Sequence, residues 1–177
     1  MSKRHAYALL FALAVPLALI GCSALQTRAQ VSPVDQHFML NAASVGVAEV
    51  RMAELAVTRA SDPAVLEFAQ HMIADHSRVN AQLLQVARAN GVVLPMMMDP
   101  ANRTLYEELG MLSGAEFDRQ YMIAQVNIHS MGNALYVTEA QNGLAADVKR
   151  FAADNAPVGE EHLMVARTIA SSALAGR

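Results

Sequence analysis

Four polar side chains fall on or beside apolar stripes whose spacing is that of a buried helix face. They are Glu49, His76, His129 and His162. His76, for example, lies between Met72 and Val79 at intervals of three and four residues, the period of the buried side of a helix. A buried imidazole is costly unless another group satisfies its nitrogens. Each of these side chains therefore needs a partner in the core.

The heights of these groups along their helices indicate what that partner is. Glu49, His76 and His129 lie near mid-helix, roughly 13 to 15 residues from the nearer turn, and His162 lies further from its turn. Positions at mid-height stay level whichever way the helices run, so we expect the four groups to converge. One carboxylate and three imidazoles suit a divalent transition metal, with zinc, copper and iron all compatible.

Two neighbouring amides leave an alternative open. Asn80 lies one turn after His76, and Gln125 lies one turn before His129. They could complete a hydrogen-bond network without metal, in which case the buried polar groups only set helix register. They could equally hydrogen-bond to histidines that bind a metal and so fix the tautomers of the imidazoles.

The elements that must position these groups are helices. Capping residues, prolines and apolar periodicity predict long helices at about 33–60, 63–90, 113–142 and 148–169, and a short one at 100–111. No strand pattern occurs. We expect an all-α fold: a ferritin-like four-helix bundle with a long connection between its second and third long helices that carries the short helix. That connection could traverse the bundle or fold over its end, which would give an up-down-up-down topology.

Four local features carry further expectations. Ser113 and Glu116 have the spacing of a capping box. Pro157 should break or kink the last helix. Asp118 suits the helix dipole and needs no other explanation. Asp75 points away from His76 along the helix, so a salt-bridge or network role is expected for it.

The first residues resemble a bacterial lipoprotein signal. A basic start and a short apolar run end in "LIGC", so residues 1–21 are expected to be removed before Cys22, which would carry lipid. Residues 22–32 would then be a tether, and 33–177 a single domain. Ser23 is not Asp, the residue that favours inner-membrane retention, so we expect anchoring at the periplasmic face of the outer membrane. An ordinary cleaved signal peptide is the alternative.

Charge excludes one class of partner. The removed part holds Lys3 and Arg4 and no acidic residue, so 11 basic residues remain against 16 acidic ones. A mildly acidic chain with few aromatic residues gives no support for nucleic-acid binding. The expected partner is a membrane, through lipidated Cys22, and the sequence identifies no protein partner.

The motifs resemble those of the domain of unknown function 4142 family of bacterial envelope proteins. The resemblance covers about 35–173, and its most specific pieces are Asp75-His76, Phe117-Asp118 with Tyr121, Gln125-Val126 with His129, and His162. It implies a ferritin-like helical bundle in the cell envelope and no settled activity. Glu49 matches the acidic position in the family's first helix.

These observations predict a lipid-anchored envelope protein that binds a metal, acts in a stress response, or both, without being an enzyme. Nothing in the chain resembles a nucleophile with its base. A di-iron oxidase is not expected either, because such centres use several carboxylates with Glu-x-x-His on two helices. The alternatives are a structural or protein-interaction lipoprotein and, less expected, a metalloenzyme acting on small oxidants.

Overall fold

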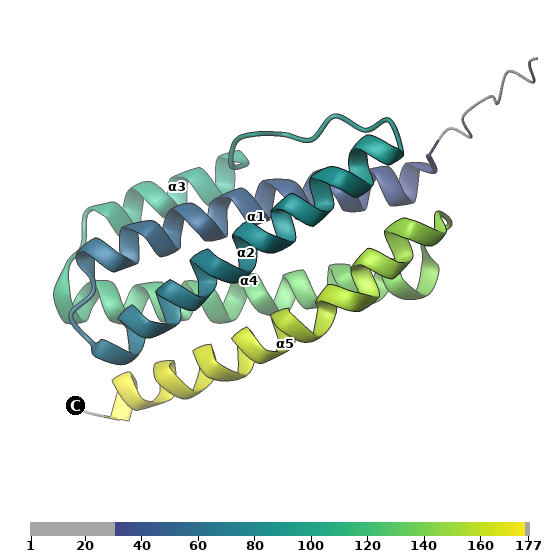
Figure 1. Ribbon diagram of the computed structural model, residues 1–177. Coiled ribbons are helices and arrows are strands. Elements are labelled where there is room, and N and C mark those ends of the chain that lie inside the picture. The colour runs from purple at the N-terminus through teal and green to yellow at the C-terminus, as the bar shows by residue number, and fades with distance from the viewer. Residues whose placement is uncertain (1–30, 176–177) are drawn as a thin grey trace, which may run out of the picture.

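The structure is a computed structural model that describes residues 31–175, with side chains as far as 172. This part of the chain is all-helical and contains no strand (Figure 1). Its helices are α1 (Pro33–Arg59), α2 (Pro63–Ala89), α3 (Pro100–Gly110), α4 (Gly114–Asn142) and α5 (Ala146–Ala175). The predicted all-α class is confirmed, as is the short helix in the long connection. The predicted signal peptide, Cys22 and most of the tether lie outside the described residues.

The first three helices begin with the same local chemistry. In each, an N-cap side chain accepts a hydrogen bond from a backbone amide of the first turn, and a proline follows the cap. The three caps are Ser32, Asp62 and Asp99. Such caps satisfy amides that the helix itself leaves unpaired, which is why the sequence placed these starts correctly.

The start of α4 differs from the prediction. Ser113 is the N-cap residue, but its side chain makes no capping hydrogen bond, so the expected capping box is wrong. Gly114 enters the helix with a φ of 60°, a conformation that glycine adopts readily, and Glu116 is paired with Arg119 instead.

Of the two outcomes expected at Pro157, the break does not occur, since α5 is helical on both sides of the proline. The missing amide of a proline frees the carbonyl four residues earlier, here that of Ala153. Both residues are exposed, so water can satisfy that carbonyl without interrupting the helix.

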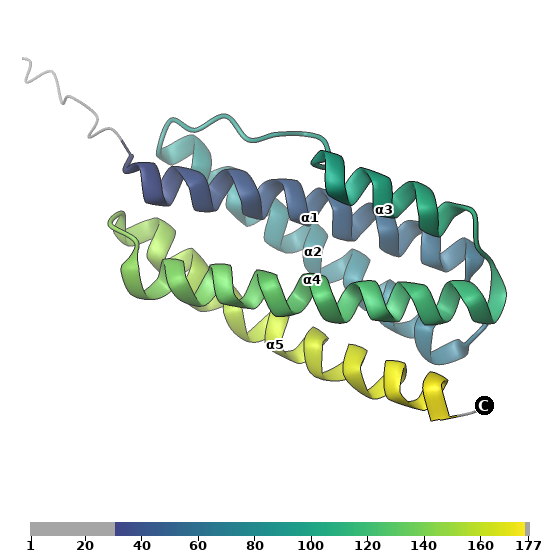
Figure 2. The same ribbon diagram turned by 180° about the vertical axis from the view of Figure 1, so that it is seen from behind.

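The four long helices lie side by side (Figures 1 and 2). α1 packs on α2 and α4, and α5 packs on α2 and α4, so α1 and α5 are diagonal to one another. α3 lies along α1 on the outside of this arrangement.

Two contacts at opposite ends fix the directions of the helices. Asp35, at the start of α1, accepts hydrogen bonds from the amides of Leu144 and Ala145 in the α4–α5 turn. Asp118, at the start of α4, accepts hydrogen bonds from Ser61 and Asp62 in the α1–α2 turn. α1 and α4 are therefore antiparallel, and the connection between α2 and α4 must run the length of the molecule (Figure 2).

That geometry settles the topology that the sequence left open in favour of the crossover. It also corrects the interpretation of Asp118. Its carboxylate does more than complement a helix dipole, because it binds the turn between the first two helices directly.

The apolar core is divided in two along the helix axes. One cluster is built around Met52, Phe68 and Tyr121, and the other around Phe38 and Leu83. The level between them is occupied by polar side chains, which is where the predicted site lies. Within 31–175, no helix is long and apolar enough to cross a membrane.

Candidate metal centre

Each of the four long helices sends one of the predicted groups to the level between the two apolar clusters. α1 supplies Glu49, α2 supplies His76, α4 supplies His129, and α5 supplies His162. The three imidazole rings have centroids 5.3 to 5.7 Å apart. One nitrogen from each ring lies within 4.8 Å of the others, close enough for the three to hold one metal ion.

Glu49 lies at the back of this group rather than within it. Its Oε1 is 3.6 Å from Nδ1 of His129, and its side chain is 1% exposed. Burial raises the pKa of the Glu49 carboxyl, while the nearby His129 and Gln125 side chains act in the opposite direction. The structure therefore places the carboxylate beside one imidazole and outside the three-nitrogen cluster.

The backbone fixes the tautomer of His129. Its Nδ1 lies 3.0 Å from the carbonyl oxygen of Gln125, one turn earlier in α4. A carbonyl oxygen only accepts, so Nδ1 must carry the proton and donate it. The lone pair of Nε2 then remains free, and this buried atom has no hydrogen-bond partner. Gln125 thus orients His129 through its main chain.

A carboxylate fixes the tautomer of His162. Its Nε2 lies 3.2 Å from Oδ2 of Asp75, and Oδ1 of the same carboxylate pairs with Arg78 at 3.1 Å. The network role expected for Asp75 is confirmed by these contacts. If Nε2 donates to this carboxylate, Nδ1 presents a lone pair, and Nδ1 is buried without a partner.

His76 completes the group from α2. Burial, reinforced by the neighbouring His129 and His162, lowers its pKa from 6.5 to about 3. Burial also lowers the pKa of His162, reinforced by His129, although Asp75 opposes the shift. Both rings are therefore neutral at physiological pH, the form in which imidazole binds metal.

Three buried imidazole nitrogens remain without a hydrogen-bond partner: Nε2 of His76, Nε2 of His129 and Nδ1 of His162. Buried polar atoms in folded proteins are nearly always satisfied, so three such atoms from rings this close require a common explanation. A divalent metal bound by the three lone pairs supplies one. The outward hydrogen bonds to a carboxylate and a carbonyl are those that metal-binding histidines usually make.

Tyr121, which the sequence marked only as part of the family resemblance, belongs to the first apolar cluster through its ring and brings a further polar group into the core. Its hydroxyl is buried without a partner, and burial, together with the charge of Glu49, raises its pKa well above 10. A signal was present, because Tyr121 precedes Gln125 by four residues and His129 by eight, so the three share one face of α4.

Asn80, predicted to support His76, occupies a different contact. Its side-chain oxygen lies against Gly46 of α1, in the space that a Cβ at that position would fill. The amide therefore contributes to the packing of α2 on α1.

Residues 21–169 match the family described as Domain of unknown function (DUF4142). The chain belongs to the DUF4142 family. All four predicted ligands lie inside the matched range. No protein with a curated description matches this DUF4142 chain.

A solved structure shows the same fold at low sequence identity. The crystal structure of a DUF305 fragment from Deinococcus radiodurans is similar to this DUF4142 chain with a TM-score of 0.71 and 12% identity. The similarity covers 80% of this chain and 98% of that one. Identity this low supports a shared helical architecture, and the polar layer must be interpreted from its own geometry.

Proposed function

We propose that this DUF4142 protein is a lipid-anchored envelope protein with the crossover form of the ferritin-like four-helix bundle, and that it binds one divalent transition metal at mid-height. The ligands are His76, His129 and His162. The observation that carries the proposal is twofold: one nitrogen of each ring lies within 4.8 Å of the others, and each ring has a buried nitrogen without a hydrogen-bond partner.

The remaining groups have supporting roles in this proposal. Glu49, predicted as a fourth ligand, provides a buried negative charge beside His129 that offsets the charge of the cation. Gln125 and Asp75 hold the rings of His129 and His162 in the tautomers that present free lone pairs. With a single carboxylate at this level, the site differs from an oxygen-activating di-iron centre. Metal storage, delivery or sensing within a stress response suits it better than oxidase chemistry.

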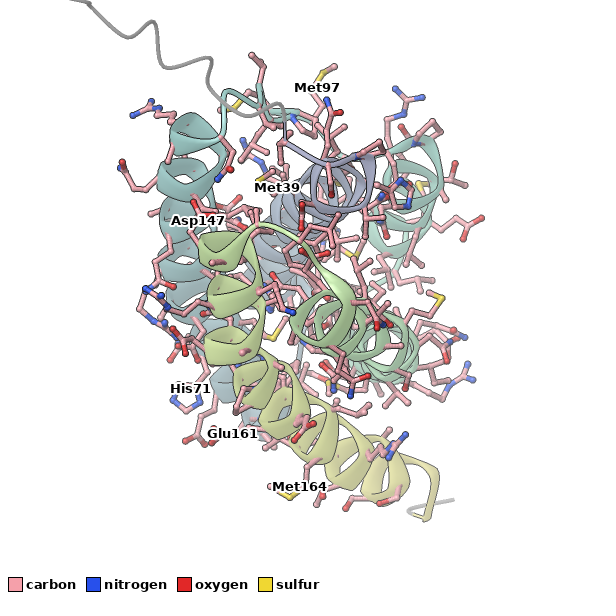
Figure 3. The ribbon with its side chains drawn as sticks, turned by 90° about the vertical axis from the view of Figure 1, so that its right-hand side faces the viewer. Met39, His71, Met97, Asp147, Glu161 and Met164 are labelled. Atoms are coloured by element: carbon pink, nitrogen blue, oxygen red, sulfur yellow. The ribbon has the colours of Figure 1, made fainter. Side chains whose placement is uncertain are left out.

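Metal analysis of the purified protein tests the proposal. We expect about one equivalent of zinc, copper or iron in the wild type and a His76→Ala, His129→Ala double variant that retains almost none. The matched control is His37→Ala, His71→Ala. It also removes two histidines, but these occupy exposed positions on α1 and α2 (Figure 3 shows His71 pointing outward).

Circular dichroism would verify that all three proteins are helical. Equal metal content in wild type and the His76, His129 double variant would overturn the proposal. The structural or protein-interaction lipoprotein would then be the better account.

The membrane anchor is tested separately. The Cys22→Ser variant should move from the membrane to the soluble fraction, because it lacks the acceptor thiol for lipid. Ser23→Asp is the control, since it keeps the thiol and should shift the protein toward the inner membrane. Continued membrane retention of the Cys22→Ser variant would contradict lipid anchoring.

A further inference from the structure

A small pocket adjoins two of the three imidazoles, those of His76 and His129. It has a volume of about 60 Å³, and its lining includes Glu49, His76 and His129 together with residues of all four long helices, most of them apolar. One water needs roughly 10–15 Å³ of such space, so the pocket has room for a ligand larger than one water. His162 does not line it.

The ligand count leaves a position for such a molecule. Three protein ligands are what zinc sites with an exchangeable fourth position provide, whereas closed structural sites use four. Here α2, α4 and α5 each supply an imidazole, while the α1 carboxylate lies behind His129. A metal held by these imidazoles lies against the pocket, because two of its three ligand rings line it.

Glycine keeps this space open. Gly132 and Gly159 both line the pocket, and a Cβ added at Gly132 would meet no atom within 4 Å. At Gly159 there is no such open space, because the side chain of Asn133 already occupies the position that a Cβ would take. A larger residue at Gly132 is thus the change best suited to filling the pocket without displacing a ligand.

Besides the imidazole nitrogens assigned to the metal, one of the lining residues has an unpartnered carboxylate oxygen. Oε2 of Glu49 is buried without a hydrogen-bond partner, and the rest of the wall is mainly apolar. A ligand that carries a hydrogen, such as hydrogen peroxide, could bind the metal through one atom and donate a hydrogen bond to Oε2 through another. These two anchors and the small volume restrict the ligand to a few non-hydrogen atoms.

We propose that the bound metal keeps an exchangeable coordination position facing this pocket, which takes small inorganic oxygen or nitrogen donors of two or three non-hydrogen atoms. This inference rests on the metal site proposed above. It adds that the metal is accessible to a small molecule of the size of hydrogen peroxide or azide.

Azide binding to the copper(II)-loaded protein tests it. We expect azide to produce a saturable charge-transfer band in the wild type. Gly132→Leu should retain one equivalent of copper and bind azide at least tenfold more weakly, and Gly132→Ala should show a smaller loss. Gly110→Leu is the matched control, because its added side chain also meets open space, but on α3 away from the pocket. It should bind azide as the wild type does.

The outcomes separate the two proposals. Failure to load copper would overturn the metal site and this inference with it. Full copper loading with no azide band, or unchanged azide affinity in Gly132→Leu, would overturn the exchangeable position alone and leave the metal site standing. Metal content, measured in every sample, also reports whether each variant has kept its folded site.

Discussion

The ends of the helix assembly and its middle both bury polar side chains, but in opposite ways. At the ends, Asp35 and Asp118 each accept several hydrogen bonds from a turn distant in sequence. In the middle, the imidazoles of α2, α4 and α5 lie close together, and each has a buried nitrogen without a hydrogen-bond partner. A satisfied buried carboxylate stabilises the fold, whereas a cluster of unsatisfied nitrogens indicates a missing ligand.

The pKa values of buried groups also differ between the ends and the middle of the helix assembly. Burial acts to raise the pKa of Asp35, but hydrogen bonds from Ser32, Glu139 and the backbone outweigh it and hold the pKa below its usual value. At the centre, no comparable set of donors or acceptors compensates the burial of His76, whose pKa falls to about 3. The ends should therefore control stability, and the middle should control metal affinity.

The largest loss of stability is expected from a substitution at one end of the helix assembly. Asp118→Ala leaves the amides of Ser61 and Asp62 without their acceptor and should lower the free energy of unfolding by on the order of 3 kcal/mol, since hydrogen bonds to charged groups are strong. Urea denaturation measures it. Asp118→Asn keeps one acceptor oxygen and should lose less. A loss below about 1 kcal/mol for the alanine variant would remove the distinction between ends and middle.

Metal should stabilise the middle independently of the ends. At a free metal concentration of 100 times Kd, the free energy of unfolding should rise by about 2.7 kcal/mol, because metal binds only the folded state. Asp118→Ala should gain the same increment, and His129→Ala should gain none. Thermal denaturation with and without zinc compares the three proteins. An equal gain in His129→Ala would place the metal elsewhere.

Loss of the Asp75 carboxylate beside His162 should weaken metal binding without abolishing it. Asp75→Ala frees the His162 ring to change tautomer and should reduce metal affinity roughly 10- to 100-fold. Glu67→Ala removes an exposed acid from the same helix and serves as the control. A competition titration with a chelator gives both affinities. Equal values would mean that Asp75 does not support the site.

A smaller effect is expected from pH at the end near Asp35. Burial, reinforced by Asp35, raises the pKa of Glu139 from 4.5 to about 7, and Lys149 opposes the shift. The folded state therefore binds more protons than the unfolded state between these pH values, so stability should fall as the pH rises through this window. After allowance for solvent screening, the loss is on the order of 1 kcal/mol.

Glu139→Gln should abolish that dependence, which urea denaturation at pH 5 and pH 8 would reveal. Retention of the full pH dependence in the variant would assign it to another group. Metal affinity of this variant should match the wild type when both are measured at one pH.

The sequence predicted the elements better than their contacts. Helix starts at Ser32-Pro33 and Asp62-Pro63 follow from local capping chemistry, so they could be placed without tertiary information. Periodicity and height brought Glu49 and three histidines to one level, because mid-helix positions stay level in either topology. The direction of the crossover could not be derived, since it depends on contacts such as Asp35 with the α4–α5 turn.

Side-chain partners depended on rotamer and rotation about each helix axis, which periodicity does not specify. Asn80 was expected to serve His76 but packs on Gly46, and Asp75 bonds to a histidine 87 residues away. The α4 capping box did not form because a positive φ at Gly114 changes how the chain enters the helix. Each of these details is set by three-dimensional packing.

The central claim is that one metal ion lies between three imidazoles, and X-ray absorption at the zinc edge tests it most directly. With one equivalent of zinc bound to the purified protein, the account predicts three imidazole ligands at about 2.0–2.1 Å, with the outer-shell scattering of their rings. The His76→Ala, His129→Ala variant should lose that imidazole signature. A wild-type spectrum with only oxygen ligands, or one unchanged in the double variant, would contradict the account.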